Sequence, residues 1–86
     1  MSRSRYHAVA TRSFLRSLHK VPQDVKTRAL RAVDEILSGP YMGVWLRGEL
    51  EGLWRWRIGN YRIIYMIEEE KGLVVFLDVG HRKAIY

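Results

Sequence analysis

A β-hairpin predicted over residues 52–65 constrains this chain more than any other feature of its sequence. The residues up to Ile58 are rich in aromatic and β-branched side chains, and a similar run begins at Tyr61. Gly59-Asn60 separates the two runs, and such a pair signals a two-residue turn, most simply of type II′ with Gly in the first central position. This turn sets the strand register, because cross-strand partners are counted outward from it.

Counting outward from the turn gives the two faces of the hairpin different characters. The predicted cross-strand pairs are Ile58 with Tyr61, Arg57 with Arg62, Trp56 with Ile63, Arg55 with Ile64 and Trp54 with Tyr65. Side chains alternate between faces along a strand, and cross-strand partners share a face. One face is therefore apolar and aromatic, with Trp54, Trp56, Ile58, Tyr61, Ile63 and Tyr65. The other face carries Arg55, Arg57 and Arg62 beside Leu53, Ile64 and Met66.

The arginine face contains an unfavourable pair, because Arg57 and Arg62 lie directly opposite each other and like charges so placed destabilise a sheet. A fold gains nothing from this pair, whereas a bound polyanion would neutralise it. Two interpretations follow. The face holds a phosphate group of a nucleic acid, or it is an ordinary solvated face whose arginines are neutralised by Glu49, Glu51 or the acidic run at 68–70.

The length and composition indicate one small domain spanning residues 1–86. A chain of 86 residues leaves no room for a second core, and 48% hydrophobic residues can supply a compact one. The absence of cysteine excludes disulfides and thiolate metal sites. No apolar run approaches the roughly 18 residues of a membrane span, and the N-terminus lacks an apolar signal core. We therefore expect a soluble, cytoplasmic protein with no membrane partner.

The positive charge is concentrated in the N-terminal third of the chain. The net charge is +6, and residues 1–32 hold eight Lys and Arg against one Asp, a balance of +7. Residues 33–86 hold seven Lys and Arg against eight Asp and Glu, a balance of −1. A basic domain with one concentrated face points to a nucleic acid or an acidic protein as its partner.

Two helices are predicted before the hairpin, after a short strand candidate at 5–10. Thr11 is a suitable N-cap for a first helix that reaches about residue 19. Pro22 suits the first position of a second helix, whose apolar residues recur at 3.6-residue spacing. Gly39-Pro40 ends that second helix. The outer face of this helix pair carries most of the excess positive charge.

The remaining strands predict an α+β fold. Residues 44–47 are a short strand candidate, and residues 73–79 are nearly all apolar, which favours a central strand buried on both faces. The order β-α-α-β-β-β implies a small, mostly antiparallel twisted sheet with the two N-terminal helices on one face. We expect the aromatic face of the hairpin to pack under the helices and the arginine face to remain open.

The end of the chain adds polar groups that suit phosphoryl chemistry. His81 and Arg82 follow the apolar strand directly, Tyr86 is the last residue, and an antiparallel sheet can bring all three beside the arginine hairpin. Arginines stabilise charge on phosphate oxygens, and His or Tyr transfers protons. The histidines lie far apart in sequence, and no acidic residue has a His at metal-ligand spacing, so we expect neither a metal site nor any other cofactor.

These residues together resemble the RelE/ParE toxin superfamily, and the RelE-like branch in particular. The resemblance rests on Leu46-x-Gly48, on Gly52-x-Trp54-Arg55-x-Arg57-x-Gly59-x-Tyr61-Arg62-x-x-Tyr65, and on Val79-Gly80-His81-Arg82 with the closing Tyr86. It covers most of the chain, and the combined pattern is specific although each piece alone is weak.

The resemblance implies a toxin of a type II toxin–antitoxin system, an mRNA interferase that cleaves mRNA in the ribosomal A site. In such an endoribonuclease the 2′-hydroxyl attacks the adjacent phosphate, leaving a 2′,3′-cyclic phosphate and a 5′-hydroxyl. The implied partners are the ribosome with its ribosomal RNA, mRNA and a cognate RelB-like antitoxin. The antitoxin is expected to lay an acidic or amphipathic segment across the basic surface.

The resemblance also implies roles for individual residues. Arg55 and Arg57 match two basic residues of the catalytic strand, and they must act as phosphate clamps because arginine does not deprotonate. Arg62 and Arg82 match arginines that bind the scissile phosphate or protonate around it. Tyr86 matches a tyrosine that acts as a base or stacks on the substrate, and His81 is expected to be a proton donor.

Two other functions remain compatible with the sequence. The ParE branch uses the same fold as a non-catalytic toxin that inhibits gyrase by protein contact. A degenerate relative would bind only RNA or an antitoxin, since binding and cleavage use the same cations.

Overall fold

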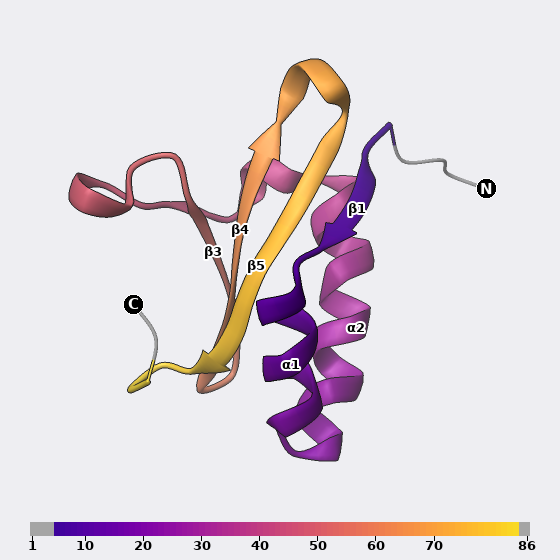
Figure 1. The fold of residues 1–86 in the computed structure, drawn as a ribbon, viewed down its shortest axis with the longest axis vertical. Coiled ribbons are helices and arrows are strands. Elements are labelled where there is room, and N and C mark those ends of the chain that lie inside the picture. The colour runs from indigo at the N-terminus through magenta and orange to yellow at the C-terminus, as the bar shows by residue number, and fades with distance from the viewer. Residues whose placement is uncertain (1–4, 85–86) are drawn as a thin grey trace.

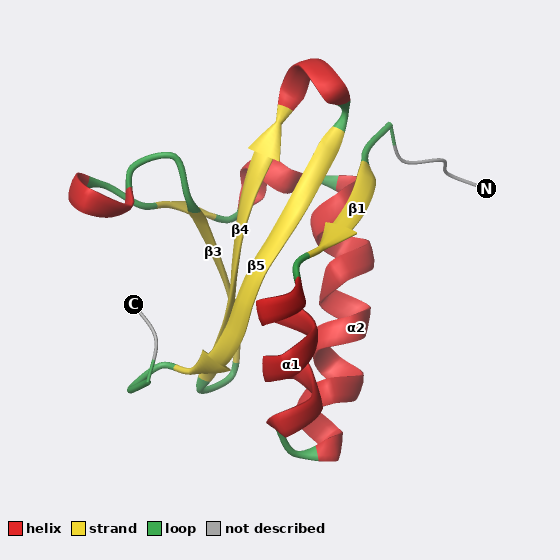
Figure 2. Ribbon diagram, viewed as in Figure 1, coloured by secondary structure: helices red, strands yellow, loops and turns green. Residues whose placement is uncertain are grey.

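The computed structural model describes residues 5–84, which form a five-stranded mixed sheet with two helices on one side (Figures 1 and 2). The strand order is β1-β5-β4-β3-β2, with β1 parallel to β5 and all other pairs antiparallel. The elements in chain order are β1 (His7–Ala10), α1 (Arg12–Lys20), α2 (Gln23–Ser38), β2 (Val44–Trp45), β3 (Trp54–Ile58), β4 (Tyr61–Glu68) and β5 (Leu73–His81). Short 3-10 turns are η1 (Pro40–Met42), η2 (Gly48–Leu50) and η3 (Glu69–Lys71).

The predicted α+β class, with both helices on one face, is confirmed. The order written as β-α-α-β-β-β counts one strand too few, but the four strand segments predicted after the helices all form. The first of these, β2, is only two residues long and pairs at the edge of the sheet. Within residues 5–84, neither helix is long and apolar enough to cross a membrane.

Helix α1 is fixed to the sheet at its first turn by Thr11. The hydroxyl oxygen of Thr11 accepts a hydrogen bond from the backbone N–H of Phe14 at 3.1 Å, as predicted for an N-cap. The same hydroxyl donates to the backbone carbonyl of Phe76 on β5 at 2.9 Å. Helix α2 begins at Gln23, one residue later than predicted, and ends before Gly39.

The core lies between the helices and the aromatic face of the hairpin. Ile63 and Tyr65 are fully buried, while Trp54, Trp56 and Ile58 pack against the core from its margin. The helices contribute Phe14, Ala29, Ala32 and Ile36, and β5 contributes Val74, Phe76 and Val79. The predicted packing of the aromatic face is therefore confirmed.

The hairpin register is also confirmed, pair by pair, from Ile58–Tyr61 through Arg57–Arg62 to Trp54–Tyr65. Gly59 has φ +65°, a left-handed conformation that favours glycine at the first central position of the turn. The guanidinium of Arg28 on α2 packs so closely that a Cβ at Gly59 would lie 2.7 Å from it.

Strand β5 differs from the prediction, which had it buried on both faces. Val74, Phe76 and Val79 are buried against the helices, whereas the other apolar residues of the strand are half-buried. The physical reason is that only one layer of helices exists, so only one face of the sheet is covered (Figure 1). Opposite Ile64 and Tyr65 the strand also contains a bulge, because these residues pair with Asp78 and Phe76 and leave Leu77 as an extra residue.

Candidate phosphate-binding site

Four arginines come together on the sheet face that the helices leave uncovered: Arg55 and Arg57 on β3, Arg62 on β4, and Arg82 just after β5. We call them the arginine cluster. Arg57 and Arg62 are cross-strand partners and therefore share a face. On its other side Arg62 pairs with Gly80, which has no side chain, so this position of β5 leaves space above the sheet.

Arg82 continues the pairing of β5 past the end of the strand. Its backbone N–H donates to the carbonyl of Asn60 in the hairpin turn at 2.8 Å. Because Arg82 lies two residues after Gly80, strand alternation places its side chain on the face of Arg62. The hairpin turn and the end of β5 thus hold Arg82 beside the other three arginines.

The pKa of Arg62 reflects how near the other three arginines of the cluster lie. Its pKa is lowered first by burial, which removes water from around the guanidinium, and then by repulsion from Arg55, Arg57 and Arg82. Repulsion between these cations raises the free energy of the ligand-free protein, and an anion placed among them would relieve it.

Two of the carboxylates considered as neutralising partners, Glu68 and Glu69, are paired with other residues. Glu69 pairs with Arg5 at 3.2 Å, and Glu68 pairs with Lys71 at 3.6 Å. Within the described part of the chain, no carboxylate forms a salt bridge with Arg55, Arg57 or Arg82. At Arg55, Arg57 and Arg82, therefore, the face lacks the neutralising carboxylates of the second interpretation.

The face is less open than expected at one position, because Ile64 is fully buried on it. Its neighbours on this face are Arg62 and Met66 along β4 and Arg55 across on β3. Long arginine side chains cover apolar surface with their methylene groups while their charged ends reach solvent. Arg57 and Arg82 are exposed, whereas Arg55 and Arg62 are half-buried, which fits this arrangement.

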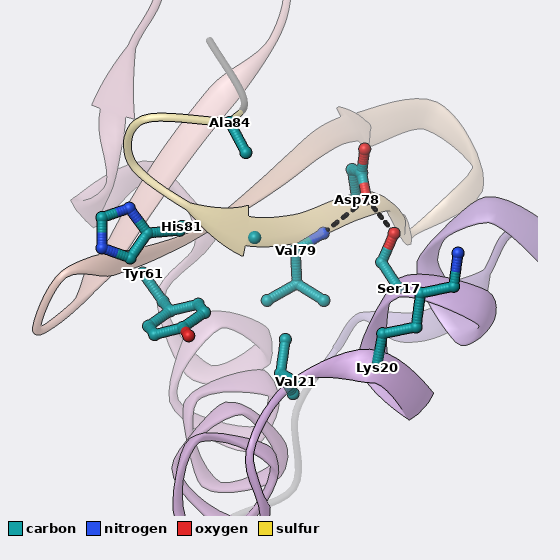
Figure 3. A pocket seen from close by; sticks show the side chains of 9 residues that line it. Ser17, Lys20, Val21, Tyr61, Asp78, Val79, His81 and Ala84 are labelled. Atoms are coloured by element: carbon teal, nitrogen blue, oxygen red, sulfur yellow. Dashed lines mark hydrogen bonds between the residues drawn. The ribbon is translucent and has the colours of Figure 1, made fainter.

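His81 lies on the opposite face, so the expectation that it joins the arginines is wrong. It pairs with Tyr61 across β4, and Tyr61 belongs to the aromatic face. The two rings meet edge to face with centroids 5.3 Å apart. Figure 3 shows both residues lining a shallow cavity of about 230 Å³ beside the end of α1, together with Lys20 and Asp78. Neighbouring residues of a strand face opposite sides, so Arg82 and His81 could not both join the cluster.

Tyr86 lies outside the described residues. Within residues 5–84, no group of three His, Asp or Glu side chains is arranged to hold a metal ion.

Two contributors to the site were not predicted from the sequence: Gly80 and the carbonyl of Asn60. The signal for Gly80 was its position directly after an apolar strand, two residues before an arginine.

Comparison with known proteins identifies the class to which this fold belongs. Residues 8–86 match the family described as the ParE toxin of the type II toxin-antitoxin system parDE. Toxin RelE of Mycobacterium tuberculosis is 31% identical over 83 residues, covering 94% of this chain and 86% of the relative. Toxin RelG of the same organism is 42% identical over 77 residues, covering 83% of this chain and 84% of the relative.

Solved structures show the same fold. The toxin–antitoxin complex RelBE2 of M. tuberculosis matches with a TM-score of 0.68 and 38% identity, covering 90% of this chain and 91% of that one. The isolated RelE toxin of Escherichia coli matches with a TM-score of 0.76 at 22% identity, covering 88% of this chain and 83% of that one.

The fold is RelE-like. The chain belongs to the RelE/ParE family and is a toxin of a type II toxin–antitoxin system.

Proposed function

We propose that this toxin is a ribosome-dependent endoribonuclease that cleaves mRNA in the ribosomal A site and so inhibits translation. The observation that carries the proposal is the arginine cluster, in which Arg57 pairs with Arg62 across the hairpin and Arg55 and Arg82 lie near enough to repel Arg62. A binder of protein surfaces has no use for four converging cations, whereas a phosphodiester in its transition state does.

The reaction needs three groups around one phosphate. The 2′-oxygen forms a bond to phosphorus while the bond to the 5′-oxygen breaks, giving a 2′,3′-cyclic phosphate and a 5′-hydroxyl. The guanidinium groups of Arg55, Arg57 and Arg82 stabilise charge on the non-bridging oxygens by bidentate hydrogen bonds. Tyr86, whose role comes from the family resemblance, accepts the proton of the 2′-hydroxyl.

Arg62 is placed to stabilise the negative charge that develops on the leaving 5′-oxygen, which takes its proton from water. Its guanidinium is half-buried beside three other cations, and these favour an oxyanion at this position. His81, on the opposite face of the sheet, has no part in these steps.

The helices are the proposed ribosome-docking surface. Their exposed basic residues are Arg12, Arg16, Lys20, Arg28 and Arg31. Contacts between such residues and ribosomal RNA release counterions, so binding should weaken steeply with salt. The same surface suits an acidic or amphipathic segment of a cognate antitoxin. Relatives have been solved as toxin–antitoxin complexes, including RelBE2 of M. tuberculosis and RelBE of E. coli.

Mapping the 5′ ends of mRNA on translating ribosomes tests the proposal. The wild-type toxin should produce cuts that depend on the ribosome. Arg62→Ala and Arg82→Ala should each lower cleavage by about 10²- to 10³-fold, the usual loss when one charge-stabilising donor is removed, without a fall in melting temperature. Lys71→Ala is the control, because Lys71 lies in η3 and pairs with Glu68. If the wild type makes no ribosome-dependent cuts, the proposal is wrong.

A second candidate is gyrase inhibition, because the matching family is described by its ParE members. Translation and DNA supercoiling assays with the purified toxin separate the two. Inhibition of translation alone supports the endoribonuclease, and inhibition of supercoiling alone supports the gyrase inhibitor.

A further inference from the structure

The chain that leaves β5 forms a short turn held by two hydrogen bonds to His81. The backbone N–H of Ala84 donates to the His81 carbonyl at 2.8 Å. The backbone N–H of Lys83 donates to Nδ1 of the His81 imidazole at 3.1 Å. Arg82 lies between His81 and the first of these donors, Lys83, and its own N–H is bound to the Asn60 carbonyl. The segment that carries Arg82 is therefore fixed on both sides, once by the hairpin turn and once by His81.

The imidazole is itself fixed on the helix side of the sheet. Its ring packs edge to face on Tyr61, with an angle of 78° between the ring planes. Figure 3 shows the His81 ring beside Tyr61 at the margin of the cavity formed with α1. The ring is half-buried there, so its orientation toward the Lys83 N–H is supported by packing as well as by the hydrogen bond.

We propose that His81 is a positioning residue: through Nδ1 it fixes the turn that holds Arg82 against the arginine cluster. The inference rests on the proposed function for its catalytic consequence, while the hydrogen bond itself can be tested without cleavage. It assigns His81 a role different from proton donation. The imidazole acts on the far side of the sheet from the phosphate and reaches the reaction only through Arg82.

This role requires the neutral imidazole. Nδ1 accepts a hydrogen bond only while it carries no proton, and protonation turns the acceptor into a donor that opposes the Lys83 N–H. The charged and titratable groups around His81 are Lys20 from α1, Asp78 from β5, Tyr61 from β4, and Arg82 and Lys83 from the turn. Acidification should therefore loosen the turn and lower activity, whereas a general acid at this position would lose activity as the pH rises.

Two substitutions separate the hydrogen bond from the ring. His81→Asn keeps a side-chain acceptor for the N–H two residues on, as in an Asx turn, but removes the ring. His81→Phe keeps the edge contact with Tyr61 and removes the acceptor. We expect His81→Asn to retain most of the cleavage rate and His81→Phe to lose about 10- to 100-fold in kcat with KM little changed, because a small misplacement of Arg82 weakens transition-state contacts. His7→Phe, at an exposed position on β1, is the control.

The pH profile gives a second readout. Wild-type cleavage should fall on acidification, and His81→Asn should lose less of its activity than the wild type over the same pH range. The inference is overturned if His81→Phe cleaves as fast as the wild type, if His81→Asn is as defective as His81→Phe, or if the activity that depends on His81 is lost on raising the pH.

Hydrogen exchange of the Lys83 amide in the full-length toxin makes the test independent of cleavage. The amide should be protected in the wild type and in His81→Asn, and it should exchange faster in His81→Phe. Equal exchange in all three proteins overturns the inference, whatever the cleavage rates. If the Lys83 amide is protected as expected but the wild-type toxin cuts no mRNA, the contact between His81 and Lys83 is upheld and the proposed endoribonuclease activity is rejected.

Discussion

At the scale of single residues, the Arg57–Arg62 pair shows a stability cost located at the proposed site. The two arginines are opposite each other on adjacent strands, and the other two arginines add to the repulsion felt by Arg62. The arrangement was predictable from the sequence because it follows from a two-residue turn and strand alternation. At the proposed phosphate site, repulsion between like charges thus opposes folding of the ligand-free protein.

Replacing Arg57 should therefore stabilise the fold while it lowers cleavage. We expect Arg57→Gln to raise the free energy of unfolding by about 0.2–1 kcal/mol at low salt, because a like-charged cross-strand pair is removed. The gain should shrink at high salt, which screens exposed charges. Urea denaturation at two salt concentrations measures both effects.

Arg16→Gln on the exposed surface of α1 is the matched control, since it removes one positive charge without removing an opposed partner. If the two variants gain equally, the effect comes from net charge and not from the Arg57–Arg62 pair.

Tyr65 is a second residue whose chemistry affects stability. Its hydroxyl donates to the carbonyl of Pro40 at 2.7 Å, and burial raises the pKa of Tyr65 to about 12. In the unfolded chain a tyrosine titrates near 10. The stabilisation from Tyr65 is thus fully present below about pH 10 and is lost as the pH rises toward 12.

We expect Tyr65→Phe to cost about 1–3 kcal/mol at neutral pH, because the buried carbonyl of Pro40 loses its donor. The same variant should lose less stability than the wild type between neutral and strongly alkaline pH. Denaturant melts at the two pH values measure the difference. An equal alkaline loss in both proteins would show that Tyr65 does not titrate in this way.

At the scale of elements, the β3–β4 and β4–β5 strand registers differ in whether a local sequence signal sets them. The β3–β4 register follows from the Gly59-Asn60 turn. The β4–β5 register includes a bulge at Leu77, and the connecting η3 turn gives no equivalent signal for it. That register decided which of His81 and Arg82 joined the cluster.

The packing around Gly43 leaves no space for a side chain, and no pattern in the sequence predicted this restriction. Gly43 begins the edge segment that pairs with β3, and a Cβ there would overlap the Tyr65 hydroxyl and lie 2.9 Å from the Arg55 carbonyl oxygen. We expect Gly43→Ala to lower the free energy of unfolding by about 1–3 kcal/mol through overpacking. Thermal or denaturant melting provides the measurement.

Gly39→Ala is the control, because a Cβ at Gly39 meets only the flexible side chain of Met42, at 3.3 Å. Combining Gly43→Ala with Tyr65→Phe should cost less than the sum of the two, since the overlapping hydroxyl is gone. Additive costs would show that the hydroxyl is not the source of the clash.

At the scale of the whole molecule, Glu69 joins three segments that are distant in sequence. Its carboxylate accepts hydrogen bonds from Tyr6 at 2.6 Å and from Tyr41 at 2.8 Å, and it pairs with Arg5. These partners come from the residues before β1 and from η1. The bonds to the two tyrosines are the main reason that the pKa of Glu69 is lowered.

A lowered carboxyl pKa gives stability that is present above the unfolded pKa and is lost as the pH falls through the folded one. We expect the melting temperature of the wild type to fall on acidification below about pH 4.5, the ordinary value for a Glu. Glu69→Gln should melt lower than the wild type at neutral pH and show a smaller acid dependence.

Glu70→Gln, in the same exposed turn, serves as the comparison for Glu69→Gln. If both variants behave alike in thermal melts across this pH range, the three-segment contact at Glu69 contributes nothing to stability.

The sequence by itself determined the hairpin register, the division into an aromatic and an arginine face, and the two helices with the Thr11 cap of the first. These features follow from alternation, from 3.6-residue periodicity and from turn and cap residues that act over a few positions. Only the tertiary structure decided that β1 lies parallel to β5, that a bulge interrupts β5, and that His81 faces α1 while Arg82 faces the cluster. The physical reason is that pairing between distant strands is set by the packing of the whole sheet, and one extra residue in a strand reverses which side chains point to which face.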